Sequence, residues 1–199
     1  MDSPLNNREI ASRKRREQVL DAAAACFVER GFHQTGMREI AKRASVSLGN
    51  LYNHFPSKHD MLIGLAELEL SSVDPFVEML MRNVRPSVCL REFTRAYFQH
   101  CSDHDAAILY LDIAAEAMRE PDIAERFLQA RSTLAEALTS LLFKGVESKD
   151  FGPSIVDTST ADLILDLIEG AAARGSIDAS KPDMLMASIE AMVFAALRH

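Results

Sequence analysis

The chain has 199 residues, of which 48% are hydrophobic, and a formal net charge of −7. This length and composition are sufficient for a buried core and exclude an intrinsically disordered protein. No apolar run approaches the roughly 18 residues of a membrane span, and the first residues lack the apolar segment of an export signal. We therefore expect a soluble, cytoplasmic protein. Its three cysteines, Cys26, Cys89 and Cys101, are too scattered for a disulfide framework and fit core packing better.

The charge is unevenly distributed along the chain. Residues 1–60 hold ten Lys and Arg against seven Asp and Glu, a net +3, whereas residues 61–199 hold twelve against twenty-two, a net −10. The acidic total argues against general coating of nucleic acid, but a basic module attached to an acidic body fits a site-specific DNA binder. Because charged tails also serve solubility, this asymmetry alone does not decide the function.

The first 60 residues predict three helices. Apolar residues recur at helical spacing through residues 14–30, and a glycine follows as a stop. A second helix is expected at 37–43, with Gly36 as a weak N-cap. A third is expected at about 47–54 and must end before Pro56.

Helical patterns continue to the end of the sequence, without strand-like alternation. Ser57 and Asp60 form a Ser-x-x-Asp cap for the next helix, which the Asp74-Pro75 pair breaks or kinks. Later boundaries are expected at Pro86-Ser87, Ser102-Asp103, Glu120-Pro121, Thr158-Ser159 and Ser180-Lys181-Pro182-Asp183. The sequence therefore predicts an all-α protein of about nine helices.

The second and third helices have the lengths and the turn of a helix-turn-helix, whose last helix enters the major groove of DNA. Leu51 and Phe55 can face inward, and Gly49 leaves room for close approach to DNA. The remaining side chains of the third helix are expected to point outward: Ser47, Leu48, Asn50, Tyr52, Asn53 and His54. Lys and Glu would suit a merely solvated helix better, so this surface favours contacts with bases and phosphates.

The stretch TGMREIAKRASVSLGNLYNHFPSKHDML, within residues 16–62, resembles the DNA-binding domain of the TetR family of bacterial one-component transcriptional regulators. The resemblance implies an N-terminal arm and helix-turn-helix domain at 1–56, followed by a helical effector-binding and dimerisation domain at 57–199. Two positions depart from the family pattern. Gly36 stands where a Ser or Thr cap is common, and Ser45 replaces the usual turn glycine.

The resemblance also implies individual roles on DNA. Phosphate contacts are implied for Thr35, Tyr52 and Lys58, base contacts for Ser47, Asn50 and Asn53, a thymine-methyl contact for Leu48, and a base or phosphate contact for Arg38. The basic run at residues 13–16 would add phosphate contacts, or else be a solvated helix end.

The last two expected helices, at about 159–174 and 182–198, are apolar over much of their circumference. Such helices need cover from both a core and a partner subunit, and the family resemblance implies a homodimer. The expected interface residues are Leu163, Leu167, Ala171, Leu185, Ile189, Met192, Val193 and Ala196.

An effector site in the acidic body is also implied by the family resemblance. The segment LDIAAEAMREPDIAERF resembles a subset of the family in which this helix pair borders the effector cavity. The expected lining is Tyr97, Cys101, Tyr110, Glu116, Phe127 and Leu167, with ordinary core packing as the alternative for each. Asp105, Asp112 and Glu116 share one helical face, so their charges require either a cationic ligand or an arginine, namely Arg91, Arg95 or Arg119.

The spacing of His100, Cys101 and His104 is compatible with a metal site. The intervening Ser102-Asp103 pair is typical of a helix junction, which would spoil the geometry, so neither a metal nor a cofactor is predicted.

The predicted function is a ligand-responsive transcriptional regulator, a repressor that binds a near-palindromic operator as a dimer and is released by a small molecule. A regulator that needs no effector, or that activates, is the alternative. An enzyme is disfavoured, because the sequence has no phosphate loop, nucleophile elbow or convincing metal cluster. The sequence does not identify the effector, the operator or the target genes.

Overall fold

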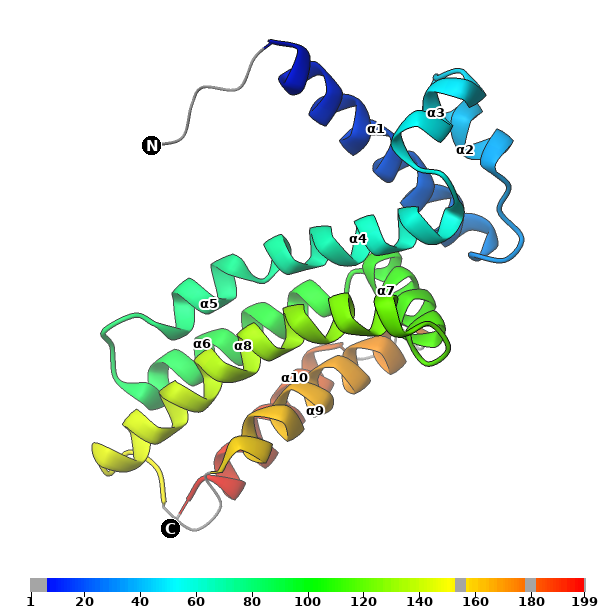
Figure 1. The fold of residues 1–199 in the computed structure, drawn as a ribbon. Coiled ribbons are helices and arrows are strands. Elements are labelled where there is room, and N and C mark those ends of the chain that lie inside the picture. Colours follow the sequence, from blue (N-terminus) through cyan, green and yellow to red (C-terminus); the bar gives the residue numbers. More distant parts are fainter. Residues whose placement is uncertain (1–6, 153–156, 178–181, 199) are drawn as a thin grey trace.

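A computed structural model describes residues 7–152, 157–177 and 182–198 of the chain, and these residues form helices without any strand (Figure 1). The helices are α1 (Asn7–Arg30), α2 (Met37–Arg43), α3 (Leu48–His54), α4 (Lys58–Ser72), α5 (Asp74–Leu80), α6 (Pro86–Cys101), α7 (His104–Ala117), α8 (Pro121–Glu147), α9 (Thr158–Ile177) and α10 (Pro182–Ala196). The prediction of an all-α protein is confirmed. The described part holds ten helices rather than about nine.

Helices α4 and α5 are separate because a proline lies at the junction. Pro75 has no N–H group to donate, and Val73 accepts the first hydrogen bonds of α5 from Phe76 and Val77, both at 3.0 Å. No described helix is long and apolar enough to cross a membrane.

Helices α1 to α3 form the expected helix-turn-helix at one end of the molecule (Figure 1). Leu51 and Phe55 are buried, as predicted. Ser57 caps α4 by accepting the N–H of Asp60, which confirms the predicted cap. Gly64 allows α4 to cross α1 closely, because a Cβ there would lie 3.1 Å from the Leu20 side chain.

The buried residues form two hydrophobic clusters. One joins α5, α6, α8, α9 and α10. The other joins α1 to α4 with Ile113 of α7 and Ile123 of α8. Met61, Leu62, Leu65 and Ala66 of α4 belong to this second cluster, so the packing of the helix-turn-helix continues beyond residue 56 into the body.

Candidate nucleic-acid interface and ligand cavity

The outer face of α3 carries the expected polar side chains. Asn50, Tyr52 and Asn53 are exposed, and a Cβ added at Gly49 would meet no atom within 4 Å. Glycine is therefore not required there by packing within the protein. Ser47 is also exposed, and its hydroxyl caps α3 by accepting the N–H of Asn50 at 3.1 Å.

Three residues expected at the DNA surface are placed differently from the prediction. Leu48 and His54 are half-buried, and Leu48 packs against the core of the helix-turn-helix. Thr35 is only 2% exposed, and its hydroxyl donates to the carbonyl oxygens of Cys26 and Gly31 at 3.1 and 2.9 Å. The Thr35 side chain thus fixes the turn between α1 and α2, which leaves only the backbone for a phosphate contact. Arg38 is exposed on α2.

Lys58 is committed to contacts inside the protein. Its ammonium group donates to the carbonyl oxygens of Phe32 and His33 at 2.6 and 3.2 Å and lies 4.7 Å from the centre of the Phe32 ring. Partial burial lowers the pKa of Lys58, and the charge of Glu116 opposes that shift. The side chain therefore ties the start of α4 to the loop between α1 and α2, and the expected phosphate contact stays a prediction.

Ser45, the unexplained departure from the family pattern, has a backbone φ of 53°. This is the left-handed region, which glycine adopts without strain and other residues adopt at a cost of about 1 to 2 kcal/mol. The turn between α2 and α3 therefore has the geometry for which the family glycine is suited, and Ser45 adopts it under strain.

We expect Ser45→Gly to stabilise the protein by about 0.5 to 1 kcal/mol, because the strain removed exceeds the entropy that glycine adds to the unfolded chain. Urea unfolding would measure the change. Lys42→Gly, inside α2, is the control and should destabilise by about 0.5 to 1 kcal/mol. A loss of stability in Ser45→Gly would contradict the explanation.

The loop between α1 and α2 is also held by α7. The N–H of Phe32 donates to the Asp112 carboxylate at 3.2 Å, and His33 lies 3.1 Å from Glu116. Arg119 approaches Glu116 at 3.5 Å, as one of the expected charge partners. Asp112 and Glu116 thus connect the DNA-binding module to the body. Glu116 was expected to line the effector cavity, but it contacts this loop instead.

The other two arginines considered as partners for the acidic face of α7 lie elsewhere. Arg91 and Arg95 of α6 both pair with Glu190 of α10. They therefore join two helices of the body.

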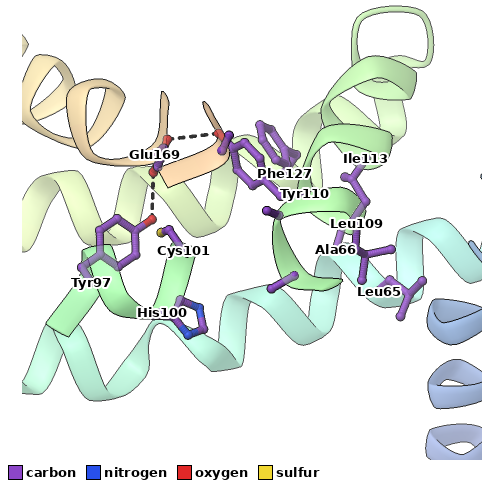
Figure 2. Close-up of a pocket in the computed structure, with 13 residues that line it drawn as sticks. Leu65, Ala66, Tyr97, His100, Cys101, Leu109, Tyr110, Ile113, Phe127 and Glu169 are labelled. Atoms are coloured by element: carbon purple, nitrogen blue, oxygen red, sulfur yellow. Dashed lines mark hydrogen bonds between the residues drawn. The ribbon is translucent and has the colours of Figure 1, made fainter. Parts of the chain in front are cut away.

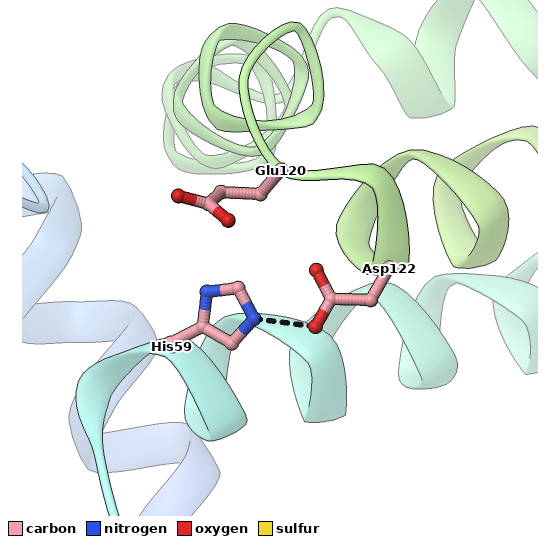
Figure 3. A group of neighbouring side chains, drawn as sticks. All are labelled: His59, Glu120 and Asp122. Atoms are coloured by element: carbon pink, nitrogen blue, oxygen red, sulfur yellow. Dashed lines mark hydrogen bonds and ion pairs between the residues drawn. The ribbon is translucent and has the colours of Figure 1, made fainter.

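A second link between the module and the body lies at the start of α4 (Figure 3). His59 Nε2 is 2.6 Å from Asp122 Oδ2 of α8, and Glu120 completes a group whose nitrogen and oxygen atoms lie within 4.8 Å of one another. The hydrogen bond to Asp122 raises the pKa of His59, and the same bond lowers the pKa of Asp122. The stabilisation is therefore complete above the ordinary Asp pKa and below the ordinary His pKa, about 4 and 6.5. It is lost as pH rises through the raised pKa of His59 or falls through the lowered pKa of Asp122.

A cavity of about 100 Å³ lies between α4, α6, α7, α8 and α9 (Figure 2). Four of the expected lining residues meet there: Tyr97, Cys101, Tyr110 and Phe127. Leu167 is not among the lining residues and contributes instead to a groove between α9 and α10. The prediction is therefore wrong for Leu167, as it is for Glu116, because neither residue is part of the cavity lining.

The sequence prediction missed Glu169, the main polar group of the cavity. This carboxylate is 8% exposed and accepts hydrogen bonds from the hydroxyls of Tyr97 and Tyr110 at 2.8 and 3.1 Å. Burial raises the pKa of Glu169, opposed chiefly by Arg131. Burial also raises the pKa values of both tyrosines, so their hydroxyls keep their protons. The available signal was the pair of acids, Asp166 and Glu169, within the apolar segment LILDLIEGAAA.

The predicted helix junction at Ser102-Asp103 is confirmed, because α6 ends at Cys101 and α7 begins at His104. His100 and Cys101 line the cavity, whereas His104 is exposed. The three residues therefore do not share one helix, which the considered metal site required.

The expected interface residues of α9 and α10 divide into three sets by their exposure. Leu163 and Met192 are 65% and 60% exposed, and Ala196 is also exposed. Ile189 and Val193 are each 3% exposed and belong to the core of the body, which argues against an interface role for Ile189. Val193 also lines the groove between α9 and α10, so for it the interface role stays a prediction. Leu167, Ala171 and Leu185 are half-buried and pack against the same core.

The helix-turn-helix and the helical body together define a class of DNA-binding transcriptional regulators. A family model described as bacterial regulatory proteins, tetR family, matches residues 19–65. The repressor KstR2 of Mycobacterium tuberculosis is 30% identical over 146 residues, which cover 71% of each chain. This chain therefore belongs to the TetR family of transcriptional regulators.

Two further relatives show the variety within this class. The activator FasR of Mycolicibacterium smegmatis is 32% identical over 130 residues, 65% of this chain and 59% of FasR. The structure of FadR from Bacillus subtilis, in complex with stearoyl-CoA, has a TM-score of 0.77 at 21% identity, and the match covers 92% of this chain and 99% of FadR. That likeness establishes the shared fold.

Proposed function

We propose that the protein is a ligand-responsive repressor that binds a near-palindromic operator as a homodimer and is released by a small molecule in the cavity. In this proposal, residues 1–56 read DNA and residues 57–199 bind the effector and the second subunit. The observation that carries it is the position of the cavity. Leu65 and Ala66 line it, and one turn earlier Met61 and Leu62 pack in the core of the helix-turn-helix.

Helix α7 supports the same coupling from the other side of the cavity. Tyr110 and Ile113 line the cavity, while Asp112 and Glu116 of the same helix hold the loop before α2. An effector that displaces α7 or α4 thereby changes the position of the recognition helix, provided that it binds the two states with different affinity.

A dimer is supported by the apolar groove between α9 and α10. Leu163 and Met192 line it and expose much of their surface in the single chain. A second copy would cover these side chains, and two-fold symmetry would place two recognition helices about 34 Å apart on one face of DNA.

The experiment that tests the function begins with selection of the preferred DNA sequence from a random library. Binding of the protein to that sequence is then measured with and without candidate effectors, and a reporter gene behind the operator distinguishes repression from activation. No preferred sequence, or no effector that changes affinity, would contradict the proposal. FadR, described with stearoyl-CoA, shows that a protein of this fold binds an organic ligand.

Within the DNA-binding surface, we expect Asn50→Ala and Tyr52→Phe to have different consequences. Asn50 is exposed on α3 and can pair with a base edge, so its loss should change the preferred base at one position by about 1 to 3 kcal/mol. The Tyr52 hydroxyl can reach a phosphate, so its loss should weaken all sequences alike. Binding to a panel of single-base operator variants measures both effects. Equal loss on every sequence for Asn50→Ala would exclude it as a base reader.

A further inference from the structure

The main polar group of the cavity lies against α9, and His100 and Cys101 of α6 also line the cavity. Glu169 faces the hydroxyls of Tyr97 and Tyr110, which come from α6 and α7 (Figure 2). Much of the remaining wall is apolar and comprises Leu65, Ala66, Ala106, Ala107, Leu109, Ile113, Phe127 and Ala173. An occupant of this site must therefore be mostly apolar, with a polar group directed at Glu169.

The hydrogen bonds already made at Glu169 determine what that polar group must be. A phenol has one proton, and both tyrosines donate theirs to the Glu169 carboxylate. What the two hydroxyls still offer toward the cavity is their oxygen lone pairs, and the carboxylate offers only lone pairs as well. This side of the cavity therefore presents acceptors and calls for a donor on the ligand.

The neighbouring arginine does not add a free hydrogen-bond donor to this side of the cavity. Arg131 directs Nη1 to both oxygens of Glu169, at 3.3 and 3.2 Å, and Nη2 to the Asp166 carboxylate at 2.5 Å and the Asp162 carbonyl at 3.0 Å. Its side chain is 17% exposed and is shared among acidic residues of α9. An anionic ligand group would meet the oxygen atoms of Glu169 and the tyrosines, and the guanidinium is already engaged.

We propose that the effector is a compact, mainly apolar molecule whose amine or hydroxyl group donates a hydrogen bond to Glu169 and the two tyrosine oxygens. Carboxylic acids and phosphate esters are excluded as the group at this position. This inference rests on the proposed function, because it names the chemical class of ligand for the same cavity.

Size sets a further limit on the ligand. The cavity of about 100 Å³ is smaller than the roughly 150 Å³ that accommodates benzene in a protein core. Probes with four carbon atoms are therefore suitable. Isobutylamine, isobutanol and isobutyrate share one branched carbon skeleton and differ in the polar group.

The test is a titration of the full-length protein with each probe, followed by NMR of the cavity residues. We expect isobutylamine and isobutanol to bind at least about tenfold more tightly than isobutyrate, a difference of about 1.4 kcal/mol. Isobutyrate binding as tightly as the other two would overturn the inference. That result would contradict the proposed ligand class, but the proposal that the cavity is the effector site would stand.

Glu169→Gln provides the matched variant, since it keeps the shape and adds an amide donor. We expect it to lose the preference for isobutylamine over isobutyrate, whereas Glu147→Gln, an exposed change on α8, should keep it. An unchanged preference in Glu169→Gln would overturn the role of this carboxylate. If that variant does not fold, the comparison of the three probes on the unaltered protein decides the question.

Failure of the proposed function has a different signature. If none of the three probes shifts the signals of the cavity residues, the cavity is not a ligand site and both proposals fall. If isobutylamine binds as expected but leaves operator affinity unchanged, the ligand class stands and the coupling to DNA does not.

Discussion

The double substitution Leu163→Arg and Met192→Arg is expected to convert the proposed dimer to a monomer and to weaken operator binding by about 100-fold, or 2.7 kcal/mol. Both side chains line the apolar groove between α9 and α10 and are largely exposed in the single chain. Two arginines on each subunit would bring like charges together across a two-fold axis and leave them desolvated. A monomer retains only half of the contacts with a palindromic operator.

Sedimentation and operator titration measure the two parts of this prediction. Met118→Arg is the control, because Met118 is also exposed but lies between α7 and α8, away from the groove. This control should remain dimeric with unchanged affinity. If the doubly substituted protein remains dimeric, the subunits meet through another surface.

Replacing Lys58 with Met should destabilise the protein by about 2 to 3 kcal/mol. Methionine keeps the length of the side chain but removes the ammonium group, and the carbonyl oxygens of Phe32 and His33 lose their charged donor. The loop between α1 and α2 would then be less firmly held, and binding to every operator should fall alike.

Thermal and urea unfolding distinguish this role from a phosphate contact. If Lys58 served only to contact DNA, its replacement would alter stability by less than about 0.5 kcal/mol while still weakening binding. Lys42→Met, an exposed change on α2, is the matched control for the loss of one charge and should leave stability nearly unchanged.

The helix-turn-helix could be predicted largely from local sequence. Leu51 and Phe55 are four residues apart, and their burial follows from helical periodicity together with the turn before them. The roles of Thr35 and Lys58 could not be predicted, because both depend on carbonyl groups supplied by another part of the fold. Their chemistry suits a phosphate and a buried carbonyl equally well.

The body was harder to predict because α9 and α10 are apolar on more than one face. Periodicity identifies the two helices, but it does not say which apolar stripe faces the core, and so it places Ile189 at the interface although this residue is buried. The cavity depends on side chains from five helices. Aromatic residues suggested part of its wall, whereas the decisive acid, Glu169, became evident only through the tyrosines that approach it.

The location of Leu65 on α4 has a geometric consequence for the proposed dimer. Leu65, at the cavity wall, is four residues from Met61 in the helix-turn-helix core, an axial distance of about 6 Å along one rigid helix. A displacement of α4 at the cavity wall therefore also moves the part of α4 that packs against the DNA-binding module, by a similar distance. The two-fold axis then doubles it, because both modules move in opposite directions. A shift of about 1 Å in each subunit alters the spacing of the recognition helices by about 2 Å, measured against a DNA repeat of about 34 Å.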